Sequence, residues 1–251
     1  MTSPNRFAAI SDIHGNLHAL EAVLERIRSL GDIELTVNLG DILSGPIEPA
    51  ATADLLISLD LPTIRGNHER QLLDCARAPG GASDQFAFEE TTAAHRSWLA
   101  ALPATLPLGE DVLLSHGTPH DDLEYLLETV TQGGSRLATG EEVASRLGAV
   151  RRSLILCGHS HIPRAVSLAD GTLVVNPGSV GIQAYTADQP LPHEVANGSP
   201  HARFAVYERG PHGWSVSQQL VAYDWDRAAE AARRHGRPDW ASRLLSGRNE
   251  A

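Results

Sequence analysis

Short apolar runs alternate with segments whose apolar residues recur at helical spacing in the first third of the chain. Residues 7–10 form an apolar run of strand length, and residues 18–30 have the spacing of an amphipathic helix. A strand at residues 33–39 and a helix at 46–59 are predicted to repeat this order, and a short strand at 62–65 begins a third unit. Three such units in succession favour an α/β core with parallel strands.

The remaining pattern is less regular and predicts mostly antiparallel strands in the second half. We expect a loop at residues 78–84 and a helical stretch at 123–128. Residues 182–203 are predicted to form an ordered surface loop of a length that is often functional. This loop, which contains Tyr185, His193 and His201, is a candidate for a substrate-binding wall together with His120. Further strands are expected at 112–114, 153–157, 165–168, 173–175, 204–207 and 216–221, and further helices at 91–102, 141–147, 224–235 and 238–245.

Composition restricts the class of protein. A chain of 251 residues that is 42% hydrophobic can bury a large core, and we favour one domain over residues 1–251. The 31 acidic and 20 basic residues give a formal charge of -11, which argues against a sequence-independent grip on nucleic acid. The two cysteines, Cys75 and Cys157, are too few for a disulfide framework and suit a reducing compartment. Without a leader or an apolar span, we expect a cytoplasmic protein without a membrane partner.

Metal-binding types of side chain follow nearly every predicted core strand. Because ligands of α/β sheets bind at the carboxyl ends of the strands, these residues are expected to lie close together. Taken alone, the first motif fits two interpretations about equally well: a metal site, or a loop in which Asp12 caps a helix and His14 has no special role. The joint placement is the specific signal, and its members are Asp12, His14, Asp41, Asn67, His68, His116, His159 and His161.

The types of donor indicate which metals to expect. Carboxylates mixed with imidazoles favour Mn, Fe, Co, Ni or Zn over Ca or Mg, and the absence of thiolates argues against a structural zinc site. Without His68, seven donors remain, which is more than one ion needs. Two ions that share one carboxylate could be coordinated by these seven donors. Paired ions are suited to in-line displacement at phosphorus.

These motifs resemble, in order and type, those of the calcineurin-like metallophosphoesterase superfamily. The resemblance rests on Asp12-x-His14, Gly40-Asp41, Gly66-Asn67-His68-Glu69, His116 and Gly158-His159-x-His161. Residues 176–181 extend it to the small bacterial and archaeal phosphodiesterases of that superfamily. The implied fold is α/β: two packed mixed β-sheets form a sandwich core flanked by helices, with a dimetal site at the carboxyl ends of the strands.

The resemblance also implies a role for each residue. Asp12, His14 and His161 would hold one ion, Asn67, His116 and His159 a second, and Asp41 would bridge them. His68 would be the general acid for the leaving oxygen or an electrostatic partner of the phosphate, and a metal-bridging hydroxide would be the nucleophile. The implied cofactors are two divalent transition-metal ions, with manganese favoured and Fe, Ni, Co or Zn as alternatives.

The favoured function is phosphodiester hydrolysis, with a phosphate ester, such as a nucleotide, as the partner. One alternative is a phosphomonoesterase, either a phosphoprotein phosphatase or a dinucleoside polyphosphate hydrolase. Residues 42–46, Ile-Leu-Ser-Gly-Pro, lack the arginine that those families place after Asp41, which argues against this alternative. A second alternative is a non-catalytic scaffold, since a retromer subunit keeps the same fold for binding. The pattern encodes neither the natural substrate nor the oligomeric state.

Overall fold

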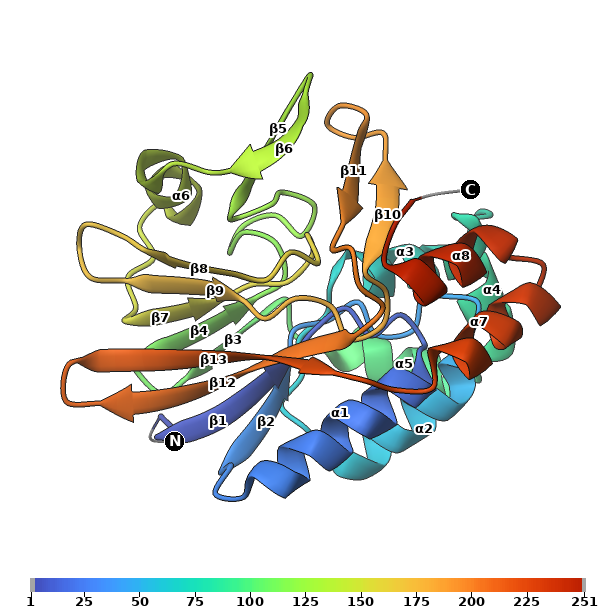
Figure 1. Cartoon of the computed structure of the whole chain (residues 1–251), viewed down its shortest axis with the longest axis horizontal. Coiled ribbons are helices and arrows are strands. Elements are labelled where there is room, and N and C mark those ends of the chain that lie inside the picture. The colour runs from blue at the N-terminus through green and yellow to red at the C-terminus, as the bar shows by residue number, and fades with distance from the viewer. Residues whose placement is uncertain (1–2, 250–251) are drawn as a thin grey trace.

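Two mixed β-sheets face one another in the computed structural model, which describes residues 3–249 (Figure 1). The four-stranded sheet has the order β13-β12-β1-β2, with bounds β1 (Arg6–Ile10), β2 (Leu35–Asn38), β12 (Ala202–Gly210) and β13 (Gly213–Val221). The five-stranded sheet has the order β3-β4-β7-β9-β8, with bounds β3 (Thr105–Leu108), β4 (Val112–Ser115), β7 (Leu154–Leu156), β8 (Arg164–Ser167) and β9 (Leu173–Asn176). The predicted fold class of two packed mixed sheets is confirmed.

The parallel part of the fold is divided between the two sheets. β1 pairs with β2 in parallel and with β12 in antiparallel, while β4, β7 and β9 are parallel to one another. The third predicted strand, at residues 62–65, is reduced to a single bridge between Thr63 and Asn38. The predicted parallel units are therefore found next to one another at the four-stranded sheet, with the third strand reduced to a bridge, and the parallel strands β4, β7 and β9 form a second set in the other sheet.

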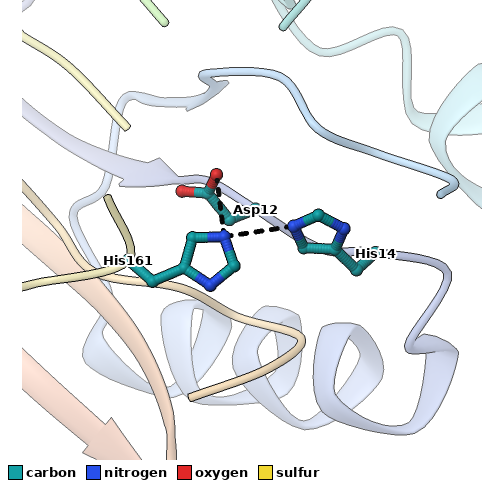
Figure 2. A group of neighbouring side chains, drawn as sticks. All are labelled: Asp12, His14 and His161. Atoms are coloured by element: carbon teal, nitrogen blue, oxygen red, sulfur yellow. Dashed lines mark hydrogen bonds and ion pairs between the residues drawn. The ribbon is translucent and has the colours of Figure 1, made fainter. Parts of the chain in front are cut away.

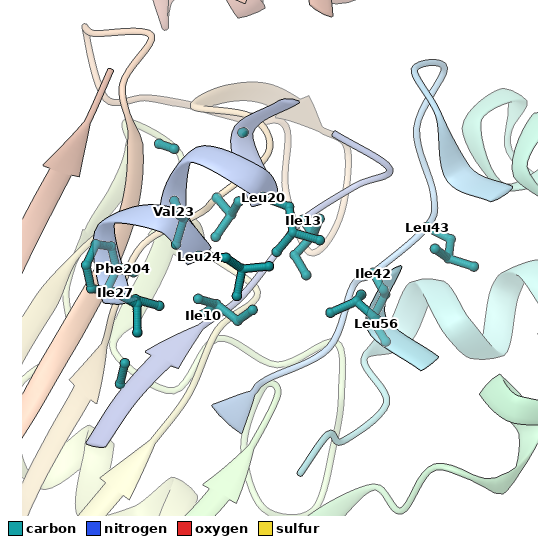
Figure 3. Close-up of a cluster of buried hydrophobic side chains, with 14 of the residues drawn as sticks. Ile10, Ile13, Leu20, Val23, Leu24, Ile27, Ile42, Leu43, Leu56 and Phe204 are labelled. Atoms are coloured by element: carbon teal, nitrogen blue, oxygen red, sulfur yellow. The ribbon is translucent and has the colours of Figure 1, made fainter. Parts of the chain in front are cut away.

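Alternation along β1 explains how the layers pack. Phe7 and Ala9 point into the core between the sheets, whereas Ala8 and Ile10 point to the opposite face. On that face Ile10 packs with Leu20 and Leu24 of the helix α1 (Leu17–Leu30), as Figure 3 shows. A strand that is buried on both faces must be apolar throughout, which is why residues 7–10 lack a polar position.

Helices cover the outer faces of both sheets (Figure 1). Asn16 caps the first helix, because its side-chain oxygen accepts a hydrogen bond from Ala19 N at 3.1 Å. Asp12 therefore remains available for another role. The helices are α1 (Leu17–Leu30), α2 (Pro49–Leu59), α3 (Asn67–Asp74), α4 (Ala82–Glu90), α5 (Ala93–Ala101), α6 (Gly140–Leu147), α7 (Trp225–Arg234) and α8 (Pro238–Ser246). Within residues 3–249, none of them has the length and hydropathy of a bilayer-spanning segment.

Two hairpins differ from the predicted elements. The prediction of a helical stretch at residues 123–128 is wrong. This segment is irregular and leads into β5 (Glu128–Thr131), which pairs with β6 (Gly134–Leu137). The loop expected at 182–203 contains β10 (Ala184–Ala187) and β11 (His193–Ala196). Both hairpins project from the same end of the sandwich and pack on one another through β6 and β11 (Figure 1).

Candidate metal centre

The eight predicted site residues converge at one end of the sheets, in loops that follow β1, β2, β4 and β7 and in the first turn of α3. Two groups are formed: Asp12 with His14 and His161, and Asp41 with His116 and His159. Within each group the ligand atoms lie within 4.8 Å of one another. Asn67 and His68 complete the set, since Asn67 Oδ1 is 3.2 Å from His116 Nε2 and His68 N donates to Asp41 Oδ1 at 2.9 Å.

The backbone of these loops is held in the left-handed region, which non-glycine residues rarely adopt. Seven described non-glycine residues have a positive φ, and five belong to the two groups: Asp12 at 54°, His14 at 51°, Asp41 at 54°, His159 at 66° and His161 at 59°. Each such residue costs about 1–3 kcal/mol, and strain of this kind concentrates at functional sites. Hydrogen bonds from Asp12 N to Gly40 O and from His14 N to Asp41 O, both 3.0 Å, hold two of these loops together.

Two motif glycines are required by close packing rather than by φ. A Cβ on Gly66 would lie 2.2 Å from Asp41 Oδ1, and one on Gly158 would lie 2.2 Å from Ser11 Oγ. Any other residue at these positions would displace the loops that carry the acidic ligands. The glycine of each motif therefore fixes the distance between neighbouring loops.

The first group presents lone pairs that face one another. His14 Nδ1 donates to Ser44 O at 2.7 Å and His161 Nδ1 donates to Ile182 O at 2.9 Å. Burial lowers the pKa of His14 to about 4 and holds the pKa of His161 well below its usual value, so both rings are neutral at pH 7. Their Nε2 atoms, only 3.1 Å apart, must then both carry lone pairs (Figure 2).

Asp12 adds a carboxylate to the same point, and because burial raises its pKa to about 7, a cation bound here would keep this carboxylate ionised. Its Oδ1 is 3.5 Å from His161 Nε2, and its Oδ2 is buried without a hydrogen-bond partner in the described part of the chain (Figure 2). Two lone pairs and an unpaired buried carboxylate oxygen repel one another unless a cation lies between them. The donors of this group therefore fit a divalent metal ion.

The second group is arranged in a similar way. His116 Nδ1 donates to Leu39 O at 2.8 Å, while its Nε2 lies 3.0 Å from Asp41 Oδ2. Burial lowers the pKa of His116, but the charge of Asp41 and the hydrogen bond to it outweigh burial and raise this pKa to about 10. His159 Nε2 donates to Leu123 O at 3.0 Å, which leaves its Nδ1 for the group. A metal ion would take the place of the proton that the carboxylate otherwise holds on His116.

Glu69 fixes the loop that carries Asp41. Its buried carboxylate accepts hydrogen bonds from the backbone nitrogens of Asp41, Ile42 and Gly66 at 2.7–2.8 Å. Three charge-assisted hydrogen bonds in a buried position join the loop after β2 to the start of α3. Glu69 thus sets the position of Asp41 relative to Asn67 and His68.

His68 has a partner that the sequence did not indicate. Its Nδ1 lies 2.7 Å from Oδ1 of Asp84, which is on α4 and is nearly buried. Burial lowers the pKa of His68, but the charge of Asp41 and the hydrogen bond to Asp84 raise this pKa to about 9. The contact with Asp84 holds Nδ1 of the ring and leaves Nε2 as the atom that faces other partners.

The site opens into a cleft of about 980 Å³ whose lining includes His14, His68, His159 and His161. Two tyrosines form one wall: the ring of Tyr125 lies 4.8 Å from that of His159, and the ring of Tyr185 lies 4.8 Å from that of His161. Their hydroxyl oxygens are 2.6 Å apart. Tyr185 thus lines the cleft as expected of the 182–203 segment, whereas Tyr125 lies in the stretch that was wrongly predicted to be helical.

Residues 6–193 match the family model described as the calcineurin-like phosphoesterase superfamily domain. The chain belongs to this superfamily. The matched segment contains all eight site residues and both motif glycines. The resemblance drawn from the motifs is therefore confirmed, and phosphoester hydrolysis is the activity typical of this superfamily.

Two individual proteins are similar over almost the whole chain. An uncharacterised protein of Methanocaldococcus jannaschii is 26% identical over 255 residues, which cover 96% of this chain and 98% of that protein. The crystal structure of a metallophosphoesterase from Sphaerobacter thermophilus superposes with a TM-score of 0.74 and 24% identity, over 96% of this chain and 99% of the other. At this identity the structural match shows a shared metallophosphoesterase fold.

Proposed function

We propose that this calcineurin-like phosphoesterase is a two-metal phosphodiesterase. Asp12, His14 and His161 would hold one ion, and Asn67, His116 and His159 would hold the other, with Asp41 between them. Two divalent transition-metal ions, with manganese as the first candidate, would neutralise charge on the phosphate and lower the pKa of a bound water to about 7. The observation that carries the proposal is the presence, in one cleft, of two ligand groups and a histidine, His68, whose Nδ1 is held by Asp84.

The bridging role of Asp41 is supported by its effect on the pKa values of histidines in both ligand groups. Its charge opposes the lowering of the pKa of His14 by burial in the first group, and it raises the pKa of His116 in the second. Its Oδ1 also accepts the hydrogen bond from His68 N. One carboxylate thus lies close enough to act on both groups, as a shared ligand must.

His68 would protonate the leaving oxygen. Cleavage of a P–O bond to an alkoxide needs a proton donor near the departing oxygen, and a positioned acid typically contributes about 10²–10⁴ in rate. Asp84 holds Nδ1 of the ring and thereby leaves the proton on Nε2 as the one to transfer. Asp84 is therefore assigned as a positioning residue that acts through His68.

The size and charge of the cleft favour a diester over a monoester. About 980 Å³ is enough for substituents on both sides of a phosphate. The positions after Asp41, where an arginine would grip a monoester dianion, are taken by Ile42 and Leu43, both fully buried. A diester carries one negative charge fewer and needs less compensating positive charge at that point.

The test compares two aryl esters with the same leaving group, bis(p-nitrophenyl) phosphate and p-nitrophenyl phosphate, with the manganese-loaded protein. We expect kcat/KM for the diester to exceed that for the monoester by about tenfold or more. A preference for the monoester would establish the phosphomonoesterase alternative. A protein that holds less than one tightly bound transition metal and hydrolyses neither ester with added manganese would support the scaffold alternative.

A further inference from the structure

One wall of the cleft is basic and lies outside the segment that matches the superfamily. Arg237, Trp240 and Arg243 occur at intervals of three residues, at the N-cap of α8 and within it, and all three line the cleft that contains His68 and His161. The family match ends at residue 193, so α8 lies beyond the matched segment. Figure 1 shows α8 packed beside β10 at the end of the sandwich that carries the site.

Trp240 anchors this wall against the metal-ligand loops. Its ring centroid is 6.1 Å from that of His14, and a Cβ on Gly45 would lie 3.2 Å from its Cη2 atom. The guanidinium of Arg237 lies over the Trp240 ring at 5.7 Å and donates to Ser83 Oγ at 3.0 Å. Ser83 precedes Asp84, which holds His68, so Arg237 reaches the part of the cleft that contains His68.

The two arginines share a single carboxylate. Arg237 forms two hydrogen bonds with Asp239, from Nε at 2.9 Å and from Nη2 at 2.8 Å. Arg243 lies 3.7 Å from Asp239 Oδ2 and 3.4 Å from Thr186 Oγ1, both longer than usual hydrogen bonds. Because a guanidinium has five N–H donors, Arg243 keeps donors that an anion in the cleft could use.

Most of the acidic groups that line the rest of the cleft have partners of their own, and among these Asp121 accepts a hydrogen bond from Leu123 N at 2.8 Å. Glu128 forms an ion pair with Arg164 at 2.7 Å, and Glu124 lies 3.7 Å from Arg146. Asp188 lies in the turn of the β10–β11 hairpin. The excess of one positive charge on the α8 wall is therefore local, in a protein whose formal charge is -11.

We propose that Arg243, together with Arg237, binds a second phosphate group of the substrate, several bonds from the phosphorus that is attacked. This inference rests on the proposed phosphodiesterase function and names its substrate class: phosphodiesters that carry an additional phosphate, such as a nucleotide diester with a terminal phosphate. A planar guanidinium matches phosphate oxygens in a bidentate manner, which makes arginine the suitable residue. The apolar surface of Trp240 between the arginines would contact the linking group.

The kinetic test uses two thymidine 5′-(p-nitrophenyl phosphate) diesters, one with a free 3′-hydroxyl and one with a 3′-phosphate. The bond that breaks is the same in both. We expect the manganese-loaded wild-type protein to prefer the 3′-phosphorylated diester by about tenfold in kcat/KM, mainly through KM. Arg243→Gln should reduce this ratio to near one, and Arg243→Lys should keep part of it.

The matched control is Arg233→Gln, which removes the same charge from α7, where Arg233 pairs with Glu230 at 3.6 Å and does not line the cleft. It should keep the wild-type ratio. A second measurement, independent of turnover, is calorimetric binding of thymidine 3′,5′-bisphosphate and thymidine 5′-phosphate to the manganese-loaded protein. The bisphosphate should bind about tenfold more tightly to wild type and lose this advantage in Arg243→Gln.

Several outcomes would overturn the inference. Equal kcat/KM for the two diesters in wild type would show that the cleft does not recognise a second phosphate. A loss in Arg243→Gln that is the same for both diesters would place Arg243 at the scissile phosphate instead. If wild type hydrolyses neither diester although both metals are bound, the proposed function fails, and the calorimetric comparison still decides whether the second phosphate is bound.

Discussion

Nε2 of His14 and Nε2 of His161 lie 3.1 Å apart, although the Nδ1 atom of each ring already donates its proton to a backbone carbonyl. Two neutral imidazoles in this arrangement direct lone pairs at one another. Proteins tolerate such a contact when a cation binds both nitrogens, because the carbonyls then orient the ligands and fix their tautomers. The metal site is thus built into the backbone of the loops, and the predictions below test its parts.

The two ligand groups should respond differently to single substitutions. His161→Ala should retain about one manganese ion per chain, whereas Asp41→Asn should weaken both sites because its carboxylate acts on both groups. Metal content after gel filtration, measured by atomic emission, checks this. His212→Gln, in the exposed turn between β12 and β13, is the control and should keep both ions. Two ions and full activity in Asp41→Asn would show that Asp41 is not the bridge.

His68→Ala should separate metal binding from proton transfer. We expect the variant to keep both metals and to lose about 10²–10⁴ in kcat on an alkyl phosphodiester. The loss should be much smaller on an aryl diester, whose phenolate departs without protonation. Steady-state rates on the two diesters are the measurement. Equal losses on both would remove His68 from the role of general acid.

Asp84→Asn should change the pH dependence of the alkyl diester reaction. A general acid is active only while protonated, so activity falls as pH rises through the pKa of His68. Burial lowers this pKa, whereas Asp41 and Asp84 raise it to about 9, and without the carboxylate of Asp84 it should move down. The descending limb of the pH–rate profile should therefore begin at lower pH. An unchanged profile would show that Asp84 has only a structural role.

Gly66→Ala should disturb the site through steric contact alone. Its new Cβ would meet Asp41 Oδ1 at 2.2 Å and His116 Cε1 at 2.8 Å, so we expect a loss of about 1–3 kcal/mol in the free energy of unfolding together with weaker metal binding. Gly140→Ala on α6 is the control, because its Cβ would have no neighbour within 4 Å. That substitution should stabilise by about 0.4–1 kcal/mol. Thermal melting and metal content measure both effects.

The candidate ligands could be picked out from the sequence because their signal is local. Each follows an apolar strand and a glycine or serine, and the ends of neighbouring strands are brought together by any sheet that pairs them. Asp84 has no such signal. Its role depends on how α4 packs against α3, which places it beside His68 although sixteen residues separate them.

The failed helix at residues 123–128 shows how tertiary contacts override a local pattern. Leu123, Leu126 and Leu127 have helical spacing, but their carbonyls are used elsewhere. Leu123 O accepts from the candidate metal ligand His159, and Leu126 O accepts from Arg146. A helix at 123–128 would need Leu123 O for its own ladder, whereas the carbonyls of its last turn would have no partner within the helix. This segment therefore orients a candidate metal ligand, and the periodicity of its apolar residues does not indicate that role.

The central claim is a centre of two metal ions that activates hydrolysis of a phosphodiester. Its most direct test is titration of the metal-depleted protein with manganese, at a protein concentration well above the dissociation constants, while hydrolysis of bis(p-nitrophenyl) phosphate is followed. We predict that the depleted protein is inactive and that the rate saturates at about two equivalents per chain. Activity that persists without metal, or that saturates at a single equivalent, would contradict the account.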